Sequence, residues 1–456
     1  MWNIVHTVSG VLLAFALPYF LFNLGIGAFA IIRSAGSLRA QERGAATLPP
    51  PAGAADSWMT YFLLPCLNES LVIRASVQDL LSRTQDSFVV VIDDASDDGT
   101  AEIARSAAEE VGHLDRILLV RRSLPDARLG KGAALNRGLR EITLDVERRG
   151  LDVDRVIVCV LDADGRLSDG ALEHALLRFA DQRIGAVQLI VRIRNRDRWI
   201  TLMQDVEFWC ISATAQFART FTGTVSLGGN GQFTRLSALQ SVDGEPWSSS
   251  LTEDLDLGLR LYAQGWLVTA SPFGYVHQQG VTNLRTLLRQ RTRWYQGHMS
   301  AIVRVPELVR SPKLGELGLL EVVLYLLVPW LIVLPWSIIQ QVILLAPLVD
   351  PASWYDIAPV SNVMATVLMW GIWYCVCFLP NLLIGITYSR RTSAVSLAKA
   401  LVLGHAMIVY NYIGYVAAWR AFFRMCFGRV SWAKTPRSME ATSRATASMQ
   451  NEVKPS

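Results

Sequence analysis

The placement of the uncharged apolar stretches constrains this chain most, because they lie at both ends of the sequence and leave a long polar middle. No residue from Val8 to Ile32 is charged, and basic residues begin immediately afterwards at Arg33. A stretch of this length crosses a bilayer core, and the basic residues predict that the following chain lies in the cytoplasm. A cleaved signal peptide would have a basic start and a shorter apolar core. We therefore expect residues 1–33 to form a transmembrane helix.

Three more apolar stretches occur late in the chain, at Leu317–Val349, Pro359–Tyr388 and Leu397–Phe423. They predict a C-terminal transmembrane region over residues 317–424. With 456 residues, 51% of them hydrophobic, the chain is long enough for one large soluble domain and several membrane segments. The expected location is the plasma (inner) membrane, with the polar middle in the cytoplasm.

The number of C-terminal crossings stays open. If the residues after 424 are cytoplasmic, an even number of crossings must precede them, yet there are three stretches. One solution is that Leu317–Val349, which contains prolines, bends back or holds two short segments. The other is that Leu397–Phe423 lies at the membrane interface, where its Lys399 and Arg420 cost less than in lipid.

The polar middle shows an alternation of strands and helices. A Pro/Ala/Gly-rich linker is expected over residues 34–57. After it, short apolar runs such as MTYFLLPCL, SFVVVIDDAS and VIVCVLDAD alternate with helical segments. This alternation predicts a mainly parallel sheet flanked by helices over residues 58–280, with ligands bound beyond the carboxyl ends of the strands.

Acidic residues follow two of the predicted strands. Asp93 and Asp94 end one strand, and Asp162 and Asp164 end another. An aspartate often only ends a strand and begins a turn. Two acidic pairs at the same edge of one sheet instead favour a polar ligand there.

Two classes of site are not expected. The six cysteines lack metal-type pairing, so neither a zinc site nor a disulfide is predicted. The net charge of +4 is small, and the polar middle has no basic stripe with interleaved aromatic residues, so no nucleic-acid partner is expected.

Six motifs in order carry a resemblance to a known family. They are DDASDDG, GKGAALN, DADG, TED, QRTRW and WAKTPR, and they extend over most of the chain from Thr60 to Arg437. The sequence resembles the membrane-bound family 2 glycosyltransferases, which include hyaluronan, chitin and cellulose synthases. The resemblance implies an α/β GT-A-type glycosyltransferase domain inserted between transmembrane helices, with amphipathic interfacial helices.

The resemblance also implies a donor site for a UDP-sugar. Breaking the bond to the diphosphate builds negative charge, which a hard divalent cation with oxygen ligands stabilises. By resemblance Asp164 binds Mg²⁺ or Mn²⁺, and Asp162 lies near the metal or the ribose. The predicted nucleotide contacts at the first motifs are Asp93, Asp94, Ser96 and Lys131.

The TED motif is where the family has its general base, which by resemblance is Asp254. Inverting transfer is a single displacement, so a carboxylate must accept the proton of the acceptor hydroxyl. Thr252 and Glu253 are expected to position Asp254, and Asp256 is expected to be structural. A simpler interpretation is that Ser250 and Glu253 form a capping box that only begins a helix.

The acceptor is expected to lie near QRTRW, in an amphipathic interfacial segment over residues 281–316. Arg285 and Arg289 suit the anionic membrane surface. By resemblance Arg291 or Arg293 lies near the diphosphate, Trp294 stacks on the acceptor sugar, and Gln290 is nearby. The turn GGNGQFTR adds Asn230 and, more weakly, Gln232.

The sequence also predicts the structure of residues 196–221 and the role of residues 425–456. Residues 196–221 are predicted to form an interfacial helix, with a helix packed inside the domain as the alternative. Residues 425–456 resemble a cytoplasmic gating loop and tail, in which Trp432, Lys434, Thr435 and Arg437 would contact the nucleotide.

These features predict a family 2 inverting hexosyltransferase that extends a polysaccharide and exports it. The alternative is a non-processive enzyme that glycosylates a membrane lipid such as diacylglycerol or a polyprenyl phosphate. A third hypothesis is a transporter or receptor that binds nucleotide without chemistry. The donor sugar, the linkage and the oligomeric state are not specified by these residues.

Overall fold

The computed structural model describes residues 58–83, 87–349, 363–392 and 395–429. The helix expected at 1–33, the linker at 34–57 and the gating-loop residues Trp432, Lys434, Thr435 and Arg437 lie outside these ranges.

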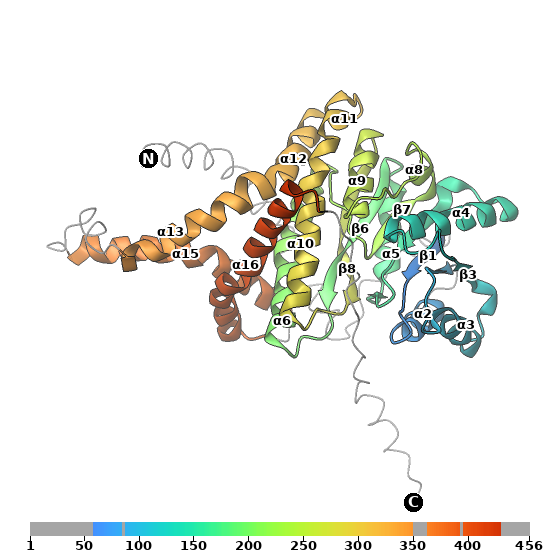
Figure 1. The fold of residues 1–456 in the computed structure, drawn as a ribbon, viewed down its shortest axis with the longest axis horizontal. Helices are drawn as coiled ribbons and strands as arrows, with labels where there is room; N and C mark the ends of the chain where they lie inside the picture. The colour runs from blue at the N-terminus through green and yellow to red at the C-terminus, as the bar shows by residue number, and fades with distance from the viewer. Residues whose placement is uncertain (1–57, 84–86, 350–362, 393–394, 430–456) are drawn as a thin grey trace, which may run out of the picture.

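The centre of the described chain is an eight-stranded sheet with the order β3-β2-β1-β4-β7-β6-β8-β5 (Figure 1). The strands are β1 (Met59–Cys66), β2 (Ser87–Asp93), β3 (Ile117–Arg121), β4 (Val156–Val160), β5 (Arg166–Leu167), β6 (Ile184–Ile193), β7 (Gln232–Arg235) and β8 (Leu267–Gln278).

The sheet is mainly parallel, as expected, but it is mixed, because two of its strands run antiparallel to their neighbours. Strands β1 to β4 pair in parallel, as do β6 and β8, but β7 runs antiparallel to both β4 and β6, and β5 runs antiparallel to β8. A parallel neighbour needs a crossover connection. Strand β7 is instead entered from the glycine-rich turn at 228–231, so its amino end lies beside the carboxyl end of β4, with Gln232 opposite Val160.

Helices cover both faces of the sheet because successive side chains of a strand point to opposite sides. Phe62 and Leu64 of β1 face one core, and Tyr61 and Leu63 face the other. The first core is closed by α2 (Ile73–Arg83), α3 (Thr100–Glu110) and α5 (Ala171–Leu176). The second is closed by α4 (Lys131–Arg149), α6 (Trp199–Val206), α7 (Ala213–Arg219), α8 (Leu236–Gln240), α9 (Glu253–Ala263) and α10 (Leu284–Ser300).

The segment expected to be an interfacial helix at 196–221 is packed in the domain, as the alternative had it. It forms α6, a π-helical turn at Glu207–Ser212, and α7. Met203, Val206, Trp209 and Phe217 are buried in the domain core, while Trp199, Ile211 and Phe221 are exposed. The amphipathic sequence of residues 196–221 suits either a membrane surface or the interior of the domain, and the tertiary fold packs much of its apolar face inside the domain.

The C-terminal part contains α11 (Val305–Arg310), α12 (Glu316–Leu327), α13 (Leu334–Val349), α15 (Val363–Arg391) and α16 (Leu397–Cys426). Three helices are long and apolar enough to cross a membrane, at Glu316–Leu345, Thr366–Arg391 and Leu397–Cys426. A π-helical turn at Val328–Val333 joins α12 to α13, so the first stretch continues in one direction and does not bend back. In Figure 1, α13 leaves the body of the molecule, whereas α16 runs beside α10.

Candidate active site

A cavity of about 420 Å³ opens at the edge of the sheet where β1 and β4 end. Most of the residues predicted from the sequence lie in its wall. They are Asp94, Lys131, Asp162, Asn230, Thr252, Glu253, Asp254, Gln290, Arg293 and Trp294.

Antiparallel β7 explains why two distant motifs meet here. Asp162 follows β4, and Asn230 precedes β7. The Asp162 backbone N–H donates to Asn230 Oδ1 at 3.2 Å, and Asn230 Nδ2 donates to Gln278 Oε1 at 3.1 Å. Asn230 therefore fixes the turn that carries Asp162, in addition to lining the cavity.

Lys131 connects the donor-side and TED motifs. Its Nζ donates to Asp162 Oδ1 at 2.7 Å and to the carbonyl oxygen of Gly229 at 2.8 Å. Burial alone would lower the pKa of Lys131, but Asp162 and Glu253 raise it above its usual value. The lysine therefore stays protonated and supplies a fixed positive charge inside the cavity.

The start of α9 places the TED residues in the wall. The helix begins at Glu253, and its N-cap residue Thr252 makes no side-chain capping bond. The capping box predicted from Ser250 and Glu253 is therefore wrong, because the Ser250 hydroxyl accepts from the Thr252 N–H at 3.3 Å instead. Asp254 Oδ1 accepts from the Leu255 N–H at 2.8 Å, which orients its carboxylate.

The two carboxyl groups of TED are both hard to ionise. Burial and the neighbouring Asp254 charge raise the pKa of Glu253 to about 7. Burial also raises the pKa of Asp254 above its ordinary value, opposed by the Leu255 N–H and Lys131. A carboxylate with a raised pKa is a stronger base, as proton abstraction from a hydroxyl requires.

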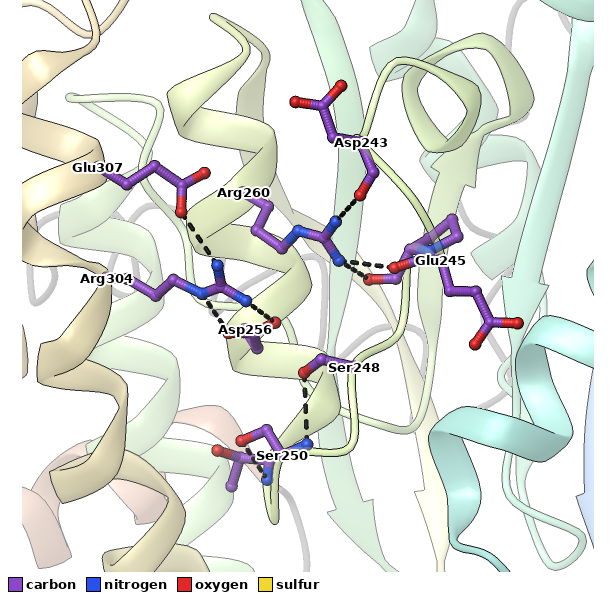
Figure 2. A network of polar contacts seen from close by, with 10 residues as sticks. Asp243, Glu245, Ser248, Ser250, Asp256, Arg260, Arg304 and Glu307 are labelled. Carbon is purple, nitrogen blue, oxygen red and sulfur yellow. Dashed lines mark hydrogen bonds and ion pairs between the residues drawn. The ribbon is translucent and has the colours of Figure 1, made fainter.

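Asp256 lies outside the cavity wall and has a structural environment. Figure 2 shows its carboxylate bound by the Arg304 guanidinium, with distances of 2.7 Å to Nε and 3.0 Å to Nη2. Arg260, one turn further along α9, donates to the carbonyl oxygens of Glu245 and Pro246. These contacts hold α9 and the preceding loop in place from the side away from the cavity.

The predicted nucleoside residues divide into two groups. Asp94 is buried, lines the cavity and is ion-paired to Arg122. Asp93 Oδ1 instead accepts from the Ser96 N–H at 3.0 Å, and the Ser96 hydroxyl accepts from the Asn68 N–H at 3.0 Å. Asp93 and Ser96 shape the loop beside Asp94 and do not belong to the described cavity lining.

The two predicted metal ligands also differ. Asp162 lines the cavity, whereas Asp164 is buried beneath it with Oδ2 accepting from the Gln279 N–H at 2.7 Å. Within the described ranges no group of three or more His, Cys, Asp or Glu side chains could hold a metal. Mg²⁺ is commonly held by one or two carboxylates together with substrate phosphates. The oxygen donors of Asp162 therefore fit a divalent ion that arrives with a diphosphate.

Arg291 or Arg293 was expected near the diphosphate, and the structure does not place Arg291 in the cavity wall. It is buried outside the cavity lining and is ion-paired to Glu207 at 2.7 Å. Its guanidinium lies 4.2 Å from the Trp294 ring centre and 5.1 Å from the Phe208 ring centre. Arg293, two residues along, turns to the opposite side and lines the cavity while donating to the Leu251 carbonyl oxygen. Helical geometry separates the two arginines, because neighbours two apart do not share a face.

We expect Arg291→Gln to raise the acceptor KM about tenfold and to leave the donor KM within about twofold, because the guanidinium holds two rings of the wall through interactions worth ~1–2 kcal/mol. Steady-state kinetics with each substrate varied separately would measure this. The matched control is Arg289→Gln on the exposed face of the same helix. Equal rises of both KM values would contradict a role confined to the acceptor side.

Sequence reasoning missed several residues of the cavity wall. They are carried by β6, the π-helical turn, β8 and α12, and include Gln188, Phe208, Gln278 and Tyr325. Phe208 lay in the segment taken as interfacial, and Tyr325 lay in a predicted membrane stretch. Nothing in their local patterns indicates a site, because only the tertiary fold brings them to it.

Comparisons with known proteins agree with this architecture. Residues 58–297 match the family described as Glycosyltransferase like family 2. The chain is 30% identical over 288 residues to a beta-monoglucosyldiacylglycerol synthase of Trichormus variabilis, covering 62% of this chain and 57% of that protein. It is 28% identical over 246 residues to a poly-beta-1,6-N-acetyl-D-glucosamine synthase of Staphylococcus aureus, covering 53% and 55%. The matches thus span just over half the length of these relatives.

Among solved structures, the mannosyltransferase PcManGT of Pyrobaculum calidifontis, in complex with GDP-Man and Mn²⁺, has a TM-score of 0.51 at 17% identity, covering 92% of this chain and all of that one. At this identity the likeness concerns the fold, which is of the GT-A type. The family match extends from β1 to the QRTRW helix and includes the motifs that meet in the cavity. The chain belongs to glycosyltransferase family 2.

Proposed function

We propose that the protein is a membrane-embedded inverting β-glycosyltransferase that transfers a sugar from a UDP-sugar to a growing polysaccharide on the cytoplasmic side. One observation carries this proposal. The Asp254 carboxylate, the Trp294 ring and the Lys131–Asp162 pair, from four separate motifs, line a single cavity. A base, an aromatic surface and a charged diphosphate site are the parts that such a transfer needs.

In the proposed reaction the acceptor hydroxyl attacks the anomeric carbon opposite the diphosphate. The new O–C bond forms as the bond to the diphosphate oxygen breaks, and UDP leaves with the electron pair. Asp254 accepts the hydroxyl proton, so no covalent enzyme intermediate is required. Lys131 and Arg293 are the cations in the cavity wall that would stabilise the leaving diphosphate.

A divalent ion, Mg²⁺ or Mn²⁺, is part of the proposal. When bound, it would neutralise charge on the diphosphate. Asp162 would hold it together with substrate phosphate oxygens, and Asp164 would support the loop from beneath. The Mn²⁺ of the mannosyltransferase with the similar fold supports this choice of ion.

The acceptor side of the cavity has features that favour a polysaccharide product and one feature that favours a glycolipid. The Trp294 ring meets Phe208 edge-on, with centroids 6.1 Å apart, and forms an apolar wall that suits a pyranose face. This favours a sugar acceptor and hence a polymer. The alternative is a glycolipid, and one observation favours it: Tyr325, from an apolar helix long enough to span a membrane, also lines the cavity. Of the two relatives above, the Trichormus variabilis protein is named as a synthase of a glycolipid and the Staphylococcus aureus protein as a synthase of a polysaccharide.

Product analysis would test the proposal. Purified protein in detergent with Mg²⁺ or Mn²⁺ would be given labelled UDP-glucose or UDP-GlcNAc, with and without diacylglycerol, and the products separated by organic extraction and size. We expect UDP release and a water-soluble polymer that linkage-specific glycosidases digest. An organic-soluble product with one sugar would establish the glycolipid alternative. Nucleotide binding without any UDP release would contradict both and favour a non-catalytic nucleotide-binding protein.

A further inference from the structure

Two of the long apolar helices have one end fixed to the catalytic domain and the other end free of it. Near its start, α12 carries buried Glu321, which is paired with Arg219 of α7 at 2.9 Å. Near its end, α15 carries Tyr388, whose hydroxyl donates to Asp205 of α6 at 2.7 Å. Between these anchors α13 and α15 extend away from the body of the molecule together, and Trp373 Nε1 donates to the Ile343 carbonyl oxygen at 3.0 Å (Figure 1).

The third apolar helix, α16, is fixed to the domain in its middle and at its end, and its first half packs on α15, where His405 Nε2 lies 2.7 Å from the Tyr374 hydroxyl. Arg391, which ends α15 shortly before α16 begins, holds that end on the domain: its guanidinium lies 3.9 Å from the Trp209 ring centre and donates to the Trp209 carbonyl oxygen. In the middle of α16, the Tyr410 hydroxyl donates to Glu207 Oε2 at 2.7 Å. At its end, Arg424 Nε donates to Gln296 Oε1 at 2.9 Å, and Gln296 Nε2 donates to the Arg429 carbonyl oxygen at 2.8 Å. A helix that lies along the domain in this way runs beside α10 instead of leaving the domain as α13 does.

The face of α16 turned away from the domain is an apolar stripe. Its members are spaced by seven residues and are 67%, 64%, 46% and 51% exposed: Val402, Val409, Val416 and Phe423. Residues seven apart fall on nearly the same face of a helix. The exposed side chain of Arg420 lies between the last two, on the same face. A guanidinium on a lipid-facing stripe is costly in hydrocarbon, but it can reach the headgroups from a helix lying in the interface.

We propose that the described part of the chain crosses the membrane twice, through α12–α13 and α15, and that α16 lies in the bilayer interface with this stripe in the lipid. Helices α13 and α15 also carry exposed apolar side chains, among them Ile338, Val342, Val367 and Ile372, and for this reason we commit the stripe to a bilayer and not to a protein partner. Two crossings return the chain to the side of the catalytic domain before α16 begins. The end of α16 at Cys426 therefore lies on that side, and the odd number of crossings inferred from hydropathy becomes an even number.

Depth measurements distinguish the two arrangements without any catalysis. The native cysteines exposed in the described ranges, Cys375 and Cys426, would be replaced by serine in the full-length protein. Single cysteines at the four stripe positions would then carry an environment-sensitive fluorophore in phosphatidylglycerol-containing vesicles. Successive positions lie about 10 Å apart along a helix axis. Quenching by lipids with nitroxides at known depths reports how deep each lies.

We expect the four stripe positions to lie at the same shallow depth, within about 5 Å, one helical turn. Cysteines at Val367, Ile372 and Leu379 of α15 are the control for a spanning helix and should show steadily changing depth. An epitope tag after Ser456 should be cleaved by protease from the same side of sealed vesicles as the catalytic domain. A depth gradient along the stripe, or a tag on the opposite side, would overturn the proposal. Because neither readout needs sugar transfer, the proposal can fail or hold independently of the enzyme's assigned activity.

Discussion

Replacing Asp254 with asparagine is expected to lower kcat by about 10²–10⁴, the range for removal of a general base. The substitution keeps the shape of the side chain and an oxygen that can accept from the Leu255 N–H, so the start of α9 should be preserved. UDP affinity should change by less than about threefold, because Lys131, Asp162 and Arg293 remain. UDP-release kinetics and calorimetric titration with UDP would measure the two effects separately.

Asp243→Asn is a suitable control, because this exposed side chain lies in the loop before α9 and only its carbonyl oxygen contacts Arg260. Its activity should match that of the unsubstituted protein. If Asp254→Asn retains more than a tenth of the original kcat, Asp254 does not act as the base, and another residue of the cavity wall must accept the proton.

The pH profile should carry the signature of the paired carboxyl groups. Burial and the Asp254 charge raise the pKa of Glu253 to about 7, and Asp254 must be ionised to accept a proton. We therefore expect kcat/KM to increase with pH along an acid limb whose apparent pKa belongs to the pair. In Glu253→Gln the profile should lose the titration near pH 7 that belongs to Glu253 and follow the ionisation of Asp254 alone. A profile that keeps this titration would show that it does not come from Glu253.

Replacing Asp205 with alanine should destabilise the protein by about 3–5 kcal/mol, the cost of leaving a buried charge without its partner. Asp205 is fully buried and accepts from Arg192 Nε at 3.2 Å, the Ile193 N–H at 2.8 Å and the Tyr388 hydroxyl at 2.7 Å. The substitution therefore removes a contact within the domain and the anchor of α15 together. The apparent Tm in detergent should fall by about 5–10 °C.

Two further variants separate these contributions. Tyr388→Phe removes the hydroxyl that reaches Asp205 and should produce a smaller decrease, because the pairing with Arg192 remains. Asp181→Ala removes an exposed pairing with Arg183 and should leave the Tm unchanged. If Asp205→Ala were as stable as Asp181→Ala, the buried pairing would not contribute to holding α15 on the domain.

The fold could be predicted to a large extent because its signals are local. Short β-branched runs alternating with helical segments indicated strands β1 to β4 and their helices, and the three apolar stretches in the described part of the chain form helices of membrane-spanning length. The direction of β7 was not predictable. A four-residue strand has no pattern that reveals its partners, and its antiparallel pairing depends on where β4 and β6 leave space.

The candidate site could be predicted where a motif itself carries the chemistry. Lys131, Asp162, Asp254 and Trp294 lie together as the motif order implied. Arg291 and Arg293 were equivalent in sequence, and the structure separated them because helix α10 turns one toward Glu207 and the other toward the cavity. The π-helical turn at Glu207–Ser212 covers the face of α10 that carries Arg291, so Arg291 pairs with Glu207 and only Arg293 reaches the cavity.

The sequence by itself determined that this chain has apolar segments of membrane-spanning length around a polar domain, and which chemical groups that domain can use. Hydropathy and motif chemistry are properties of residues close in the chain, so they are readable without the fold. The tertiary structure alone decided which apolar helix lies along the domain, which arginine faces the cavity and which strand runs in reverse. Each of these depends on contacts between residues tens to hundreds of positions apart, such as Gln296 with Arg429, whose free energy no local pattern records.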